Sequence, residues 1–255
     1  MLIRFIKSYM DELSQRQIDI LTAIIKEYTE SGQAVGSEII EKKYKMGVSP
    51  ATIRNEMVSL EKKGYLQKTH FSSGRLPSPK GYRFYIVNVM KEKELSTVDE
   101  VAYKHSIWDD RLKQHKVLSQ ATRVLAQRTG LLSLVATTSG DLYYSGVGNL
   151  LKEDEFMNVA VSKNLCMRLD EINFWEEILR QTVVLDEDLL FILGTEDFRD
   201  PVFESCVSIF GDFEAKETRG IIGVVGPKHL HFDTIIPQVR YFSHLIEDII
   251  KEYST

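Results

Sequence analysis

Residues 49–64 read SPATIRNEMVSLEKKG, and this stretch decides the fold of the N-terminal part of the chain. Ser49 is a favourable N-cap residue, and Pro50 stands at the first helical position, where its missing N–H costs nothing. Three apolar residues then recur at i, i+4 and i+7, the spacing of one buried helix face. They are Ile53, Met57 and Leu60. The stretch therefore predicts a helix that turns its remaining side chains toward solvent.

Two further helices are predicted before this one. Ser14 and Gln17 have the spacing of a capping box, and an apolar stripe follows as far as Gly32, which can end the helix in the left-handed conformation. Ser37 is the expected N-cap of a second, short helix, and residues 46–48 form the next turn. Helices connected in this way are typical of a helix-turn-helix unit.

A β-ribbon is predicted after the third helix. Residues 65–70 and 75–77 read as two strands joined by a turn. Because Pro77 has no backbone donor, we expect it on an edge strand. Ser78-Pro79 repeats the cap-plus-proline signal and predicts a fourth helix over residues 80–90. A ribbon in this position is the wing of a winged helix-turn-helix.

Charge is distributed unevenly along the 255 residues. The whole chain has a net charge of −5, but residues 1–91 hold 15 Lys+Arg and 9 Asp+Glu, whereas residues 92–255 hold 17 and 28. Within residues 41–83 the numbers are 10 and 3. A basic N-terminal third on an acidic body is typical of a DNA-binding module that carries a separate domain. Chance clustering on a solvated face accounts for the charge alone equally well.

The exposed side of the third helix carries groups that suit DNA. The N-terminal end of a recognition helix meets base edges in the major groove. There Arg54 can donate two hydrogen bonds to guanine, Asn55 can pair with adenine, and Thr52 can touch a thymine methyl. Serine hydroxyls and flanking lysines can hold phosphates. The predicted DNA-binding residues are Lys42, Lys43, Ser49, Ala51, Thr52, Arg54, Asn55, Ser59, Lys68, Arg75 and Arg83.

This pattern alone allows two other interpretations of the exposed face: a helix that is merely solvated, or a helix-turn-helix that binds another protein. Three motifs in register narrow the choice: SPATIRNEM at residues 49–57, KTHFSSGRLP at 68–77 and SPKGYRFY at 78–85. Together they resemble the HrcA family of heat-inducible transcription repressors over about residues 13–87. The segment GIIGVVGP at residues 220–227 also resembles the closing part of that family.

The resemblance implies a fold and a function. It implies a homodimer that binds an inverted-repeat operator in double-stranded DNA upstream of chaperone operons, with chaperonin as the modulator that heat shock diverts. It also implies a GAF-like second domain that contains an inserted dimerisation segment. This chain is shorter than is usual for the family between about residues 137 and 173, so we expect that segment to be reduced or missing.

We therefore expect an α+β protein with a winged helix-turn-helix DNA-binding domain over residues 1–91, a linker over 92–110 and a GAF-like regulatory and dimerisation domain over 111–255. Short apolar runs bracketed by helical stretches predict strands and helices together in the second domain. Within it, residues 211–219 read as a polar connection between two strands.

The cellular compartment follows from the cysteines and from the apolar runs. Cys166 and Cys206 form no CxxC pair and stand beside apolar residues, so we expect buried free thiols in a reducing cytoplasm. Residues 1–10 lack the long apolar core and the cleavage site of a signal peptide. No run approaches 18 apolar residues. We expect a cytoplasmic protein without a membrane partner.

Other constellations in the sequence are weak. His229 and His231 would share one face of a strand, but no third metal ligand is evident. The spacing of Gly220, Gly223 and Gly226 fits close packing better than a phosphate loop. We expect no catalytic site, metal or cofactor. The alternative function is a metabolite-responsive regulator whose GAF-like domain binds a small effector, and an enzyme with an appended winged helix is a more distant one.

Overall fold

The chain divides into two compact units, Met1–Lys91 and Glu92–Thr255, and each is described by itself. The computed structural model describes residues 13–68, 74–109, 113–181, 184–186, 189–215 and 218–253. The expectations for residues 1–10 and for the tip of the wing therefore lie outside the described residues.

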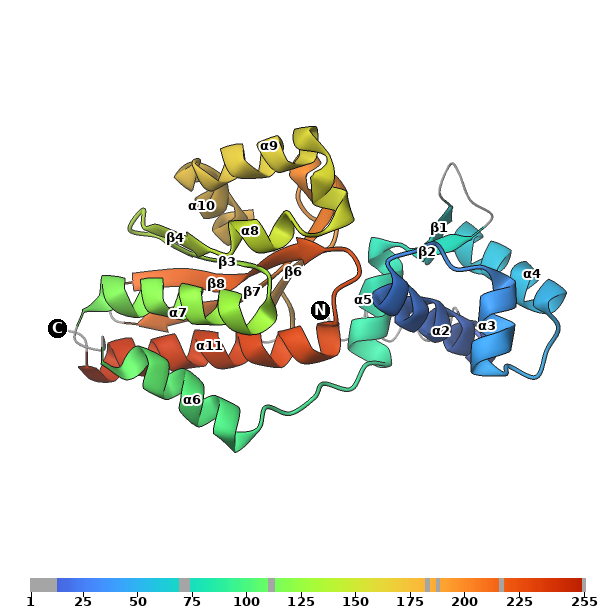
Figure 1. Cartoon of the computed structure of the whole chain (residues 1–255), viewed down its shortest axis with the longest axis horizontal. Helices are drawn as coiled ribbons and strands as arrows, with labels where there is room; N and C mark the ends of the chain where they lie inside the picture. Colours follow the sequence, from blue (N-terminus) through green and yellow to red (C-terminus); the bar gives the residue numbers. More distant parts are fainter. Residues whose placement is uncertain are drawn as a thin grey trace. The chain divides into compact units, whose positions relative to one another are not determined.

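The first unit contains the helices and the ribbon that the sequence predicts (Figure 1). They are α2 Gln15–Ser31, α3 Ser37–Tyr44, α4 Pro50–Lys62, β1 Leu66–Lys68, β2 Arg75–Pro77 and α5 Pro79–Asn88. The capping box of α2 is present: Ser14 Oγ accepts a hydrogen bond from Gln17 N at 3.3 Å, and Gln17 Oε1 accepts one from Ser14 N at 3.3 Å. The expected cap Ser37 is instead the first residue of α3, and Gly36 is its N-cap.

The core of the first unit lies between α2 and the elements that pack on it. The inward side chains of α4 are at most 3% exposed, as their spacing predicts. Each large apolar side chain contributes roughly 1.5–3 kcal/mol when fully buried. This burial fixes the rotation of α4 about its own axis. The buried residues of this core include Ile20, Ile24, Ile40, Ile53, Met57, Leu60 and Tyr65.

The wing ribbon has a third participant. β1 and β2 pair antiparallel, with Lys68 opposite Arg75 and Leu66 opposite Pro77. Arg75 also exchanges two backbone hydrogen bonds of 2.9 Å with Val35, which precedes α3. In the two-stranded ribbon β2 is an edge strand, as expected for Pro77, and the bridge to Val35 occupies its outer side only at Arg75. Pro77 has no backbone N–H to donate. It is compatible with the ribbon because the second pairing is an isolated bridge that involves Arg75 and not Pro77.

Among the described residues, the second unit is built on a six-stranded antiparallel sheet in the order β4-β3-β8-β7-β6-β5. The strands are β3 Leu132–Thr137, β4 Leu142–Ser145, β5 Val184–Asp186, β6 Leu189–Ile192, β7 Cys206–Ala215 and β8 Thr218–Pro227. The expected polar connection over residues 211–219 is wrong. The polar residues Asp212 and Glu214 suggest a loop, but they lie in the strand β7. They are its exposed positions, and the buried Phe213 lies between them, as expected for a strand with alternating faces.

Helices cover both faces of this sheet (Figure 1). One layer consists of α6 Thr97–Trp108, α7 Gln114–Thr129 and α11 Phe232–Tyr253. The other consists of α8 Val147–Leu150, α9 Val159–Leu169, α10 Ile172–Gln181 and the 3-10 helix η1 Asp154–Met157, and a second 3-10 helix, η2 Pro201–Glu204, precedes β7. Within the described part of the chain, none of these helices has both the length and the apolar character needed to cross a bilayer.

The expected linker over residues 92–110 is wrong, because α6 occupies most of it and belongs to the second unit. Tyr103 is 4% exposed, and its ring lies 5.1 Å from that of Phe242 on α11. The apolar residues Val98 and Val101 of α6 are exposed, which hides the helical stripe in the sequence.

The two cysteines lie in different environments. Cys206 is buried as expected, and burial raises the pKa of its thiol to about 12. Cys166 is exposed, so the expectation that it is buried is wrong. On α9 the inward positions belong to Leu165 and Leu169, and Cys166 lies between them on the outer side.

The glycine spacing in β8 reflects close packing, as expected. A Cβ atom on Gly223 would lie 1.9 Å from the carbonyl oxygen of Ile209, and one on Gly220 would lie 2.7 Å from the carbonyl oxygen of Ala136. Neither neighbour is a flexible side-chain end, so these positions exclude larger residues.

Replacing Gly223 by alanine is expected to lower the free energy of unfolding by about 1–3 kcal/mol, because the new methyl group overlaps the backbone of β7. Gly148→Ala on α8 is the matched control, since a Cβ there meets nothing within 4 Å, and it should change stability by less than about 0.5 kcal/mol. Urea unfolding followed by circular dichroism measures both. Equal stability of the two variants would contradict the packing argument.

Candidate nucleic-acid interface

The helix α4 presents one face to solvent because its opposite face is in the core. Ala51, Arg54 and Asn55 are exposed, and Thr52 is half-buried. The cap forms as predicted: Ser49 Oγ accepts a hydrogen bond from Thr52 N at 3.2 Å. The N–H groups of the first turn and the positive end of the helix dipole favour an anion at this end.

Lysines surround this face at the ends of neighbouring elements. Lys42 and Lys45 lie at the end of α3, Lys62 ends α4, and Lys68 ends β1, and all four are exposed. With 10 Lys+Arg against 3 Asp+Glu over residues 41–83, the region is strongly basic. Such charge attracts a phosphate backbone independently of base sequence.

Two of the predicted phosphate contacts are held in ion pairs within the protein. Lys43 Nζ lies 2.7 Å and 2.8 Å from the two carboxylate oxygens of Glu27, whose side chain is 7% exposed, and this hydrogen bond raises the pKa of Lys43. Arg75 Nε lies 2.8 Å from Glu61 Oε2, and the Arg75 side chain is only 13% exposed. The structure therefore gives Lys43 and Arg75 acidic partners on α2 and α4.

Three more predicted residues are partly engaged or covered. Ser59 Oγ accepts a hydrogen bond from Gln17 Nε2 at 3.2 Å, and Thr52 Oγ1 lies 3.0 Å from Ser49 Oγ. Arg83 is half-buried on α5. The remaining predicted residues are all exposed, and they are Lys42, Ser49, Ala51, Arg54, Asn55 and Lys68.

A buried amide, which no motif in the sequence reveals, links α2 to α4. Gln17 is 8% exposed. Its Nε2 donates to Glu56 Oε2 at 2.9 Å, and its Oε1 accepts from Lys63 Nζ at 3.0 Å. Together with the bond to Ser59, these contacts engage residues from the middle and the end of α4. In the sequence, Gln17 is recognisable only as the partner of Ser14 in the capping box.

The exposed half of α4 can read bases by hydrogen bonding. Arg54 offers two parallel donors, which match guanine O6 and N7, and Asn55 offers a donor and an acceptor, which match adenine. Each such bidentate pair discriminates by roughly 1–3 kcal/mol against a wrong base.

A capped third helix with one face exposed, followed by a β-ribbon, defines a winged helix-turn-helix protein with an α+β second unit. The model described as "Winged helix-turn-helix transcription repressor, HrcA DNA-binding" matches residues 12–88, and the "HrcA protein C terminal domain" model matches residues 85–236. The chain belongs to the HrcA family.

Curated relatives carry the same family name, "Heat-inducible transcription repressor HrcA". The protein from Clostridium tetani (strain Massachusetts / E88) is 46% identical over 129 residues, which are 50% of this chain and 37% of the relative. That from Clostridium botulinum (strain Eklund 17B / Type B) is 36% identical over 186 residues, which are 70% of this chain and 54% of the relative. The chain thus spans about half the length of such relatives, or less.

One solved structure supports the fold over almost the whole chain. It is described as a crystal structure of a hypothetical protein at 2.2 Å resolution, and it covers 95% of this chain and 100% of its own, with a TM-score of 0.76. At 19% sequence identity, this likeness concerns the fold alone.

Replacing Gln17 by alanine is expected to loosen α4 from α2, because Glu56 and Lys63 lose a buried partner, at a cost of about 1–3 kcal/mol. Amide hydrogen exchange of the full chain, followed peptide by peptide, should show faster exchange in α4. Gln33→Ala is the control, because Gln33 is exposed. Unchanged protection of α4 in Gln17→Ala would show that apolar packing alone holds the helix.

Proposed function

We propose that this chain is a sequence-specific DNA-binding transcriptional repressor of heat-shock operons. The observation that carries the proposal is the exposure of Arg54 and Asn55 on the first half of α4, within a strongly basic unit. Membership of the HrcA family and the names of its relatives support the repressor activity and its relief by heat.

The proposal includes a homodimer on an inverted-repeat operator. One recognition helix reads only a few base pairs, whereas two helices related by a two-fold axis read two half-sites about one helical turn apart. A two-fold protein then requires a palindromic site. The second unit supplies the contact between the two copies in this proposal.

The proposal also includes the regulation that the family resemblance implies. The operator lies upstream of chaperone genes, and chaperonin keeps the repressor competent until heat stress diverts it. The protein acts in the cytoplasm, where its DNA target lies. The relatives are named heat-inducible transcription repressors, and these names support the link to heat stress.

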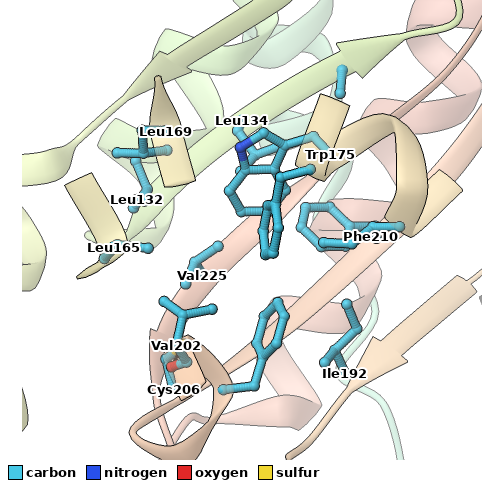
Figure 2. Close-up of a cluster of buried hydrophobic side chains, with 14 of the residues drawn as sticks. Leu132, Leu134, Leu165, Leu169, Trp175, Ile192, Val202, Cys206, Phe210 and Val225 are labelled. Atoms are coloured by element: carbon cyan, nitrogen blue, oxygen red, sulfur yellow. Dashed lines mark hydrogen bonds between the residues drawn. The ribbon is translucent and has the colours of Figure 1, made fainter. Parts of the chain in front are cut away.

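The competing function, a regulator that binds a small effector inside its second domain, has less support. Figure 2 shows the side chains that pack between the sheet and the layer containing α9 and α10. Trp175 is fully buried, donates from Nε1 to the carbonyl oxygen of Arg168 at 2.8 Å, and lies 6.2 Å from the ring of Phe210. Phe174 stacks on Phe203 at 6.1 Å. Packed aromatic rings here favour a structural core over a ligand site.

Replacing Arg54 or Asn55 by alanine is expected to reduce the preference for operator over random DNA by about 1–3 kcal/mol, or roughly 5- to 150-fold, because each loses a base contact. Fluorescence anisotropy with both duplexes, over a range of salt concentrations, measures the preference.

Lys42→Ala is the matched control for these two variants. It should weaken binding to both duplexes alike and reduce the slope of log affinity against log salt by about 1, as the loss of a phosphate contact does. If Arg54→Ala and Asn55→Ala behave like Lys42→Ala, these residues contact phosphates and the base-reading assignment is wrong.

Inserting roughly 5 bp between the half-sites is expected to reduce operator affinity sharply, because half a helical turn moves the second half-site to the opposite side of the duplex. Restoring a whole turn, with roughly 10 bp inserted, should recover part of the affinity. Electrophoretic mobility shift assays with the three spacings measure this. Equal affinity for all three would argue against a rigid dimer with a fixed distance between its recognition helices.

A further inference from the structure

A surface groove of about 530 Å³ runs along the second unit between the outer face of α7 and the strand β4. Its walls include His115, Lys116 and Arg123 of α7 and Tyr143 and Ser145 of β4. The groove lies on the face of the sheet opposite the aromatic core of Figure 2. The helix α4 belongs to the other unit.

The charge of α7 is opposite to that of the unit that carries it. Residues 92–255 hold 28 Asp+Glu and 17 Lys+Arg, but α7 contains no acidic residue. Lys116 and Arg123 are seven residues apart, about two helical turns, so they lie on one side of α7. Both are exposed, as is His115, and Arg123 hydrogen-bonds the neighbouring Gln120. The α7 wall of the groove is therefore basic in an otherwise acidic unit.

The other wall is the edge of the sheet. β4 is the terminal strand in the order β4-β3-β8-β7-β6-β5, and in the described part of the chain it pairs only with β3. Leu142 packs against the core cluster on the opposite face. Alternation along the strand then directs Tyr143 and Ser145 toward α7. An edge strand presents unpaired N–H and C=O groups. The edge strand β4 is four residues long and contains neither a charged residue nor a proline.

We propose that this groove binds an extended, acidic segment of a partner protein, which adds to β4 as a further strand and places its carboxylates against the basic side of α7. Strand addition supplies backbone hydrogen bonds, and the charged wall supplies selectivity for acidic residues. Alternate side chains of the added strand point to the same face, so carboxylates at every second position meet Lys116 and Arg123.

The same observations disfavour nucleic acid as the occupant. Binding to a phosphate backbone grows with the number of phosphates that are neutralised, and this groove offers few cations on a unit whose net charge is −11, from 17 basic and 28 acidic residues. The remaining charge of the unit repels a polyanion, whereas a short acidic peptide carries only a few charges into the groove.

The test uses the full chain and a fluorescein-labelled peptide of roughly eight residues in which glutamate alternates with valine, long enough to overlap both ends of β4. Fluorescence anisotropy should show saturable binding. The double variant K116E/R123E should weaken it about tenfold or more, because two attractive charge pairs become repulsive. K152E/K163E, which reverses two exposed lysines on the α8–α9 side of the sheet, should leave binding unchanged.

Further variants locate the peptide on the chain. K42E/R54E in the first unit should leave peptide binding intact; if it abolishes binding and K116E/R123E does not, the peptide binds the basic winged helix and the proposal is wrong. K116Q/R123Q, whose folding is checked by circular dichroism, should give an intermediate loss. If a short DNA duplex, and not the peptide, responds to K116E/R123E, the occupant is nucleic acid.

A modified peptide tests whether the segment adds to β4 as a strand. Two peptides of the same sequence, one N-methylated at the odd amides and the other at the even amides, keep their carboxylates, and each loses the backbone donors along one edge of the strand. At least one of them should bind much more weakly than the unmodified peptide, and equal binding of all three would overturn strand addition.

Discussion

The surface proposed to read DNA depends on one packing constraint, the burial of Ile53, Met57 and Leu60 on the inner side of α4. A helix advances by about 100° per residue, so fixing three inner positions also fixes the direction of every outer one. Arg54 and Asn55 stand one and two residues after the inward Ile53, so they are turned about 100° and 200° away from it, and both are exposed. The buried amide of Gln17 adds polar contacts, because it forms hydrogen bonds with Glu56 on α4 and with Lys63 at the end of this helix. Apolar packing fixes the rotation of α4, and the Gln17 amide adds hydrogen bonds between α2 and α4.

The packing of α2, α4 and the wing also determines which positive charges of the first unit are paired within the protein. Glu27 on α2 is almost fully buried, and a buried carboxylate requires a partner, which Lys43 provides. Arg75 is likewise paired with Glu61, while its backbone joins the ribbon to Val35. These cations stabilise the arrangement of helices and wing. The exposed positive charges on which the proposed DNA contact depends are then mainly those of Lys42, Arg54 and Lys68.

The second unit has a filled hydrophobic core and a sheet edge, at β4, that pairs with no further strand among the described residues. One face of its sheet is filled by Trp175 and the phenylalanines around it, and the other face is covered by α7 and α11. The sheet nevertheless ends at β4, where nothing in the described residues continues the ladder. Because α7 is basic while the unit is acidic, this edge differs chemically from the rest of the surface. The strand addition proposed at β4 therefore leaves the core of this unit closed.

The sequence by itself determined the local structure and the family. Caps, proline positions and apolar spacing act within a few residues of one another, which is why the helix beginning at Ser49 and the one beginning at Ser14 could be placed without coordinates. The tertiary structure decided what depends on distant partners. Lys43 meets Glu27 across 16 residues and Gln17 meets Lys63 across 46, and no local pattern encodes such pairings. For the same reason α6 was hidden: only contact with α11 shows that Tyr103 is a core residue, because the exposed Val98 and Val101 obscure its helical face. The residues of α4 themselves determine which of its faces is exposed, because the apolar positions must be buried. The charges that remain exposed around α4 depend on the packing of α2 and the wing against it, because Glu27 and Glu61 pair with Lys43 and Arg75.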